Sequence, residues 1–76
     1  MSPQLPILKS RDVIKALQHG GFYIHHQTGS HIQLKHYDKS WLRVTIPFHS
    51  GDLTKTIIRS IIKQAEMTVQ EFIDLL

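Results

Sequence analysis

The sequence predicts an α+β fold in which a three-stranded antiparallel sheet carries helices on one face, in the order α-β-β-β-α with a short C-terminal helix. Three observations predict it. Apolar and polar residues alternate in three runs between residues 22 and 47, as in half-buried strands. Apolar residues at helical spacing precede and follow those runs. With 76 residues the chain is expected to form a single domain, 1–76, with a small core.

The first predicted helix follows an extended segment from Pro3 to Lys9. Ser10 is a favourable N-cap residue, and Asp12 suits the first turn, where the helix dipole favours negative charge. Gly20-Gly21 is expected to end the helix. Its apolar face is predicted to consist of Val13, Ile14 and Leu17.

The first predicted hairpin joins 22–27 to 31–37 through the three-residue loop Thr28–Ser30. Gly29 can adopt the left-handed conformation that such loops usually need. On this register His25 and His31 both face away from the core. The expected pairs are Tyr23 with Lys35, Ile24 with Leu34, His25 with Gln33, and Gln27 with His31.

A second hairpin is expected to turn through Asp38-Lys39-Ser40. Its predicted pairs are Ile32 with Ile46, Leu34 with Val44, Lys35 with Arg43, and Tyr37 with Trp41. Like charges directly opposite each other are unfavourable. The outer face of the sheet is therefore expected to meet an anion or an acidic partner, unless the two long side chains splay apart.

Pro47 is predicted to end the third strand because it has no N–H for a strand ladder, and residues 48–52 are expected to form a loop. The helix that follows has the largest apolar stripe in the chain, which should cover the sheet. Thr68 and Glu71 have the spacing of a capping box, which predicts a short helix over 68–75. The stripe consists of Ile57, Ile58, Ile61, Ile62 and Ala65.

Positive charge is concentrated in the first 65 residues, which carry nine basic and three acidic groups, +6, although the whole chain has a formal charge of +3. This excess favours an anionic partner such as nucleic acid or an acidic protein, or it only keeps the protein in solution. Lys9, Arg11 and Lys15 gather at the start of the first helix, whose backbone amides favour phosphate. The alternative is an ordinary solvated helix face.

The absence of cysteine excludes disulfides, thiolate zinc sites and cysteine nucleophiles. No apolar run has the length of a signal peptide or a membrane span, so a cytoplasmic protein without a membrane partner is expected. Adjacent His25 and His26 should point to opposite faces of a strand, as should His31 and His36. We therefore expect neither a metal site nor a cofactor.

Four elements, in order, resemble the HicA (YcfA-like) toxin family over nearly the whole chain. They are a capped first helix ending in Gly21-Phe22, the triplet Gly29-Ser30-His31, a strand ending in 44-VTIP-47 with His49 just beyond, and 59-RSIIKQA-65 in the second helix. The chain departs from the family pattern before the triplet, where it has His26-Gln27-Thr28, at Thr56-Ile57, and at Glu66, where a glycine often ends the helix.

The resemblance implies a double-stranded-RNA-binding-domain-like fold, cleavage of mRNA by the histidine of the triplet, and inhibition by a HicB-like antitoxin. That role falls on His31. RNA supplies its own nucleophile, the 2′-hydroxyl, so cleavage needs one group to accept its proton and another to protonate the leaving 5′-oxygen. Histidine suits both tasks near neutral pH.

The expected RNA-binding residues are Lys35 and Arg43 at the scissile phosphate, Gly29 and Ser30 in the turn, and Lys9, Arg11 and Lys15 on the first helix. The second proton carrier stays open, although His25 is expected on the same face as His31. Two other functions also stay open: an inactive RNA-binding module of the double-stranded-RNA type, and a domain whose basic face binds an acidic protein.

Overall fold

The computed structural model describes residues 4–76, so that Pro3, the first residue of the predicted extended segment, lies outside the described residues. The elements follow one another as β1 (Leu8–Lys9), α1 (Ser10–His19), β2 (Phe22–Gln27), β3 (His31–His36), β4 (Arg43–Pro47), β5 (Asp52–Leu53), α2 (Lys55–Gln64) and α3 (Val69–Ile73).

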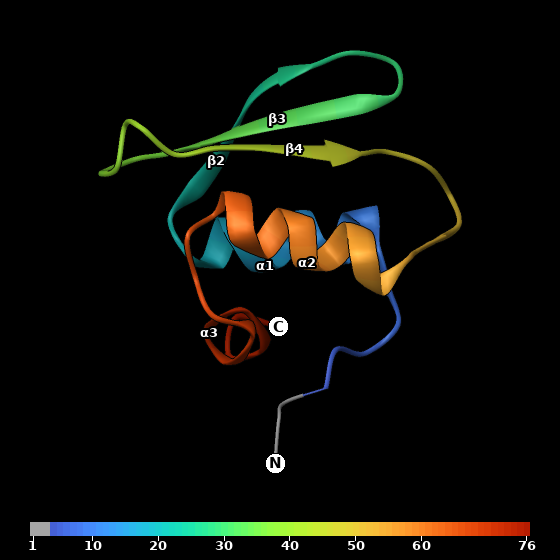
Figure 1. Cartoon of the computed structure of the whole chain (residues 1–76). Coiled ribbons are helices and arrows are strands. Elements are labelled where there is room, and N and C mark those ends of the chain that lie inside the picture. Colours follow the sequence, from blue (N-terminus) through green and yellow to red (C-terminus); the bar gives the residue numbers. More distant parts are fainter. Residues whose placement is uncertain (1–3) are drawn as a thin grey trace.

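Strands β2, β3 and β4 form an antiparallel sheet in that order. Helices α1 and α2 lie on one face of this sheet, and α3 lies on the far side of the helices (Figure 1). The α+β class, the three-stranded sheet with helices on one face and the short C-terminal helix are confirmed, and the arrangement is that of a double-stranded-RNA-binding domain. No helix within residues 4–76 is long and apolar enough to cross a membrane.

The core lies between the sheet and the helices. The predicted stripe of α2 is confirmed, since Ile58, Ile61, Ile62 and Ala65 are buried and Ile57 packs against them. The face predicted for α1 is buried as well. The other buried apolar side chains are Leu5, Leu8, Ala16, Phe22, Ile32, Leu34, Leu42, Val44, Ile46, Leu53 and Phe72.

The register between β3 and β4 agrees with the sequence prediction. Ile32 pairs with Ile46, Leu34 with Val44, and Lys35 with Arg43. The expected strand pair of Tyr37 with Trp41 is wrong, because β3 ends at His36 and β4 begins at Arg43. Tyr37 instead stacks on Tyr23, with ring centroids 4.6 Å apart.

The register between β2 and β3 is predicted correctly only at the end of the hairpin away from the turn. Tyr23 pairs with Lys35 and Ile24 with Leu34, but His26, not His25, pairs with Gln33, and Gln27 pairs with Ile32, not His31. The Thr28 N–H donates to the His31 carbonyl over 2.9 Å, so the turn closes around Gly29-Ser30.

The turn has two residues. Between the Ile24–Leu34 pair and this turn, β2 therefore has one residue more than β3. A β-bulge between Ile24 and His26 absorbs this extra residue. Gly29 is not in the left-handed region, because Gly21 is the described glycine with positive φ. The predicted three-residue loop is therefore wrong.

The N-cap of α1 also differs from the prediction. Lys9 is the N-cap residue, and its backbone N–H donates to the Asp12 carboxylate over 2.9 Å. Ser10 lies inside the helix and is buried, and its hydroxyl donates to the Pro47 carbonyl over 2.6 Å. A buried hydroxyl needs a partner, and here it joins the start of α1 to the end of β4.

Two very short strands were not predicted. Leu8 pairs with Leu53 and Lys9 with Asp52, so Asp52 belongs to β5 and not to the expected loop. The Lys9 ammonium lies 3.3 Å from the Asp52 carboxylate across this pair. Strands of two residues show no alternation, so the sequence offers no pattern that would predict them.

The C-terminal end of α1 and the N-terminal end of α3 agree with the sequence prediction. Gly20 and Gly21 come directly after α1, and Gly21 has a φ of 94°. Thr68 is the N-cap of α3, and the capping box with Glu71 is confirmed. The backbone N–H of Thr68 donates to the Glu71 carboxylate, and this hydrogen bond lowers the pKa of Glu71.

Candidate nucleic-acid site

The turn between β2 and β3 is held by backbone hydrogen bonds from two directions. The Thr28 N–H donates to the His31 carbonyl, and the Phe48 N–H donates to the Ser30 carbonyl over 2.8 Å. Gly29 protrudes, and a Cβ at this position would meet nothing within 4 Å. The turn is thus fixed at its base while its tip is open to a partner.

His31 begins β3 on the outer face of the sheet. It is exposed, whereas the next residue, Ile32, is buried, so the predicted orientation away from the core is confirmed. The Ser30 hydroxyl lies 3.1 Å from His31 Nδ1, at hydrogen-bond distance. Because Nδ1 is engaged by Ser30, Nε2 is the ring nitrogen available for proton transfer to or from a ligand.

Lys35 and Arg43 lie on the same outer face of the sheet as His31, but at a different place along the strands. They pair with each other at the other end of the β3–β4 ladder. Four residues of extended strand separate Lys35 from His31, a distance of about 13 Å. These two cations therefore lie on the same face as His31 but toward the opposite end of the ladder.

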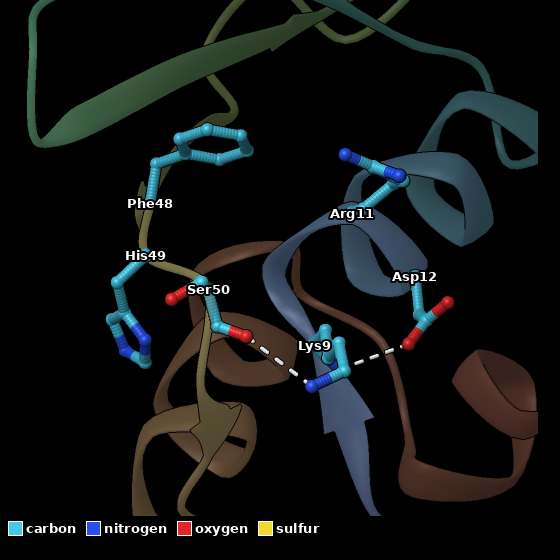
Figure 2. A pocket seen from close by; sticks show the side chains of 6 residues that line it. All are labelled: Lys9, Arg11, Asp12, Phe48, His49 and Ser50. Atoms are coloured by element: carbon cyan, nitrogen blue, oxygen red, sulfur yellow. Dashed lines mark hydrogen bonds between the residues drawn. The ribbon is translucent and has the colours of Figure 1, made fainter.

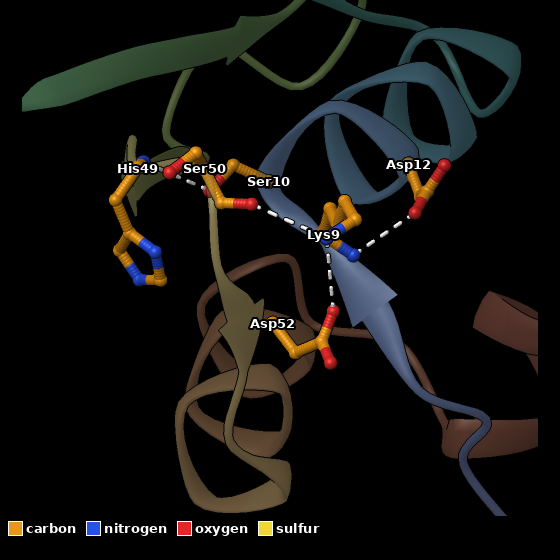
Figure 3. Close-up of polar contacts among 6 residues, drawn as sticks. All are labelled: Lys9, Ser10, Asp12, His49, Ser50 and Asp52. Carbon is orange, nitrogen blue, oxygen red and sulfur yellow. Dashed lines mark hydrogen bonds and ion pairs between the residues drawn. The ribbon is translucent and has the colours of Figure 1, made fainter.

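The three basic residues at the start of α1 have different surroundings. Lys9 donates through its ammonium to the Ser50 carbonyl over 3.2 Å and pairs with Asp52, as Figure 3 shows. Arg11 and Lys15 are exposed on the helix. Lys9 thus has a structural role at the β1–β5 pair, and Arg11 and Lys15 are the cations of α1 better placed for an external anion.

A pocket of about 380 Å³ lies beside the start of α1, lined by Lys9, Arg11, Asp12, Phe48, His49 and Ser50. The Arg11 guanidinium points toward the Phe48 ring (Figure 2). A second hollow, of about 470 Å³, continues past Arg11 and Phe48 between α1 and the β2–β3 hairpin and includes Lys15 and Gln27. Arg11 and Phe48 therefore border both hollows.

Phe48 was not identified from the sequence as a site residue. Its side chain is 38% exposed, and its backbone holds the turn that carries His31. An exposed aromatic ring next to an arginine is a surface on which a nucleobase can stack. The one sequence signal was its position, between the strand-ending Pro47 and His49.

The histidines do not cluster as metal ligands. Within residues 4–76, no group of three or more His, Cys, Asp or Glu side chains is arranged to hold a metal ion. His36 is committed to the fold: Nε2 lies 3.0 Å from the Gly20 carbonyl, and Nδ1 accepts the N–H groups of Asp38 and Lys39. The His49 ring lies beside Gly51.

Comparison with known proteins adds one finding. The sequence model of the family described as the HicA toxin of bacterial toxin–antitoxin systems matches residues 10–67, which is most of the chain and contains the turn, His31 and every residue that lines the two hollows except Lys9. No curated protein matches the chain significantly.

Proposed function

The chain belongs to the HicA toxin family, the toxins of bacterial toxin–antitoxin systems, and on this premise we propose that it is an endoribonuclease that cleaves mRNA with His31 and without a metal ion. The observation that carries the proposal is the position of His31. It is an exposed imidazole at the end of a core strand, with Nδ1 hydrogen-bonded to Ser30 and the backbone on both sides fixed.

The reaction is an internal transesterification. The 2′-oxygen attacks the adjacent phosphorus, the bond from phosphorus to the 5′-oxygen breaks, and the products end in a 2′,3′-cyclic phosphate and a 5′-hydroxyl. One imidazole can accept or donate a proton in this step near neutral pH, a contribution of about 10²- to 10⁴-fold. The reaction needs no metal-bound water because the nucleophile belongs to the RNA.

We expect the RNA to bind along the basic residues of the protein. Gly29 and Ser30 would contact the RNA at the catalytic turn through backbone and hydroxyl groups. Lys35 and Arg43 would hold phosphates farther along the outer face of the sheet, and Arg11 and Lys15 would hold the strand beyond the turn. Phosphate contacts of this kind position RNA without selecting its sequence.

The partner that controls the enzyme is proposed to be a HicB-like antitoxin. The simplest physical block is occlusion, in which the antitoxin covers His31 and places acidic residues against the cations of the outer face. Complementary charge would make the association fast at low salt.

The test is cleavage of RNA by the purified protein in the presence of a chelator. Cleavage should occur with wild-type protein, and His31→Ala should lower its rate by about 10²-fold or more while leaving the thermal unfolding curve unchanged, since His31 is exposed. His19→Ala is the matched control, because His19 is also an exposed histidine but lies beside the Leu75 carbonyl, outside both hollows.

Cleavage of RNA by the His31→Ala protein at the wild-type rate would refute the assignment of His31 as the catalytic residue. If wild-type protein binds RNA but does not cleave it, with or without added divalent metal, the chain is an RNA-binding module and not a nuclease. Cleavage that the chelator abolishes would refute the metal-independent mechanism.

A further inference from the structure

We propose that His26 is the second proton carrier of the site, acting with His31 on opposite sides of one phosphate. This inference rests on the proposed ribonuclease function and extends it to a residue that neither the sequence pattern nor the family match assigns. The observation that carries it is the β-bulge in β2.

The bulge changes which histidine shares a face with His31. In a regular ladder from the Ile24–Leu34 pair, His25 would stand opposite Gln33 and His26 would turn to the helix side. The extra residue shifts the register, and the structure pairs His26 with Gln33. Bulges are common beside active sites, where they redirect a side chain.

Gln33 and His31 lie two residues apart on β3 and therefore point to the same face. The residues between and beyond them, Ile32 and Leu34, are buried on the helix side. Because His26 is opposite Gln33, it is the diagonal neighbour of His31 across the hairpin, at a separation of about 7–8 Å. His26 and His31 are both exposed, and a phosphate between two imidazoles at this separation is within reach of both.

The other histidines are occupied or lie elsewhere. Nδ1 of His19 lies 3.0 Å from the Leu75 carbonyl near the C-terminus. Both ring nitrogens of His36 are engaged by backbone groups. The His49 ring lies beside Gly51. His25 is the additional residue of the bulge, and as an exposed neighbour of His26 it provides the natural control.

The proton transfers balance with two histidines. A neutral imidazole accepts the 2′-hydroxyl proton as the bond from the 2′-oxygen to phosphorus forms. A protonated imidazole gives its proton to the 5′-oxygen as that oxygen leaves phosphorus. The two rings exchange their protonation states, and proton exchange with water restores them. Such a pair gives a rate that falls at both low and high pH, since one histidine must be neutral and the other charged.

The first experiment measures kcat/KM for RNA cleavage against pH. Wild-type protein should give a bell-shaped profile. His26→Asn should lower the maximum by about 10²- to 10⁴-fold and remove one limb of the bell. His25→Asn should keep both the rate and the profile. All variants should unfold at the wild-type temperature, because the replaced side chains are exposed.

The second experiment uses RNA whose scissile 5′-oxygen is replaced by sulfur. A thiolate leaves without being protonated, so this substrate no longer needs the general acid. One of the two variants, His26→Asn or His31→Asn, should then cleave at the wild-type rate, and the other should stay slow because it lacks the base. The variant that recovers identifies the acid.

The inference is overturned if His26→Asn keeps the wild-type rate and profile, if His25→Asn has the same defect as His26→Asn, or if the sulfur substrate restores neither variant. These outcomes differ from failure of the proposed function. In that case His31→Ala itself would cleave RNA normally, or wild-type protein would not cleave at all.

Discussion

Replacing Gly21 by alanine should strongly destabilise the protein. Gly21 has a φ of 94°, and a Cβ there would lie 2.7 Å from Nε2 of His36. The backbone conformation alone costs an L-residue about 1–2 kcal/mol. Displacing His36 would also weaken its hydrogen bonds to the Gly20 carbonyl and to the N–H groups of Asp38 and Lys39, each with a net contribution of about 1 kcal/mol.

Alanine offsets part of this cost, about 0.4–1 kcal/mol, because it restricts the unfolded chain. The net loss of unfolding free energy is therefore about 2–4 kcal/mol. For a domain of this size, 1 kcal/mol corresponds to about 4–8 °C in Tm. Thermal unfolding followed by circular dichroism should thus show a Tm lowered by about 8–32 °C.

Gly29→Ala is the matched control. Its Cβ would meet nothing within 4 Å and its φ is not positive, so only the gain from the restricted unfolded chain remains, and its Tm should be about 2–8 °C above that of the wild-type protein. A double-mutant cycle of Gly21→Ala with His36→Ala should show a coupling energy, because the two residues compete for one space. A Gly21→Ala protein as stable as the Gly29→Ala protein would refute the reasoning, and additive effects in the cycle would refute the contact with His36.

Two further predictions concern charge. Lys35→Glu or Arg43→Glu should weaken RNA binding and reduce the slope of log K against log salt by about 1 per lost phosphate contact, as measured by fluorescence anisotropy. Lys63→Glu, an exposed cation on α2, is the control with the same charge change, and an unchanged slope for the first two would exclude them as phosphate contacts. A purified HicB-like antitoxin should inhibit cleavage and protect residues 27–35 from hydrogen exchange, with association slowed by salt. Inhibition with His31 still reactive toward an imidazole-modifying reagent would rule out occlusion.

The sequence predicted the elements whose patterns are long or chemically specific. The stripe of α2 and the alternation of β3 and β4 each depend on several residues facing one core, so the register of β3 with β4 followed from the apolar pairs Leu34–Val44 and Ile32–Ile46. The capping box of Thr68 and Glu71 is a local interaction, which a short sequence can determine by itself.

The features that sequence reasoning missed depend on contacts between distant segments. Ser10 looked like an N-cap, but the carbonyl of Pro47, 37 residues away, binds its hydroxyl. Glu66 ends α2 with a φ of 55°, the left-handed conformation that glycine adopts more easily. Its neighbour Met67 completes the helix end by donating to the Ile62 carbonyl over 3.3 Å, so the helix ends at this point without the glycine.

The bulge in β2 explains why the site was predicted only in part. One end of the hairpin requires Ile24 to stand opposite Leu34, and the tight turn at the other end requires Thr28 to stand opposite His31. The registers that these two requirements impose differ by one residue. Neither requirement alone shows at which position of β2 the extra residue is placed. Absorbing it between Ile24 and His26 leaves His31 where its alternation places it and pairs His26, not His25, with Gln33. Under the proposed function, the β-bulge beside the Ile24–Leu34 pair thus decides which histidine would face the RNA, without a change in any buried side chain.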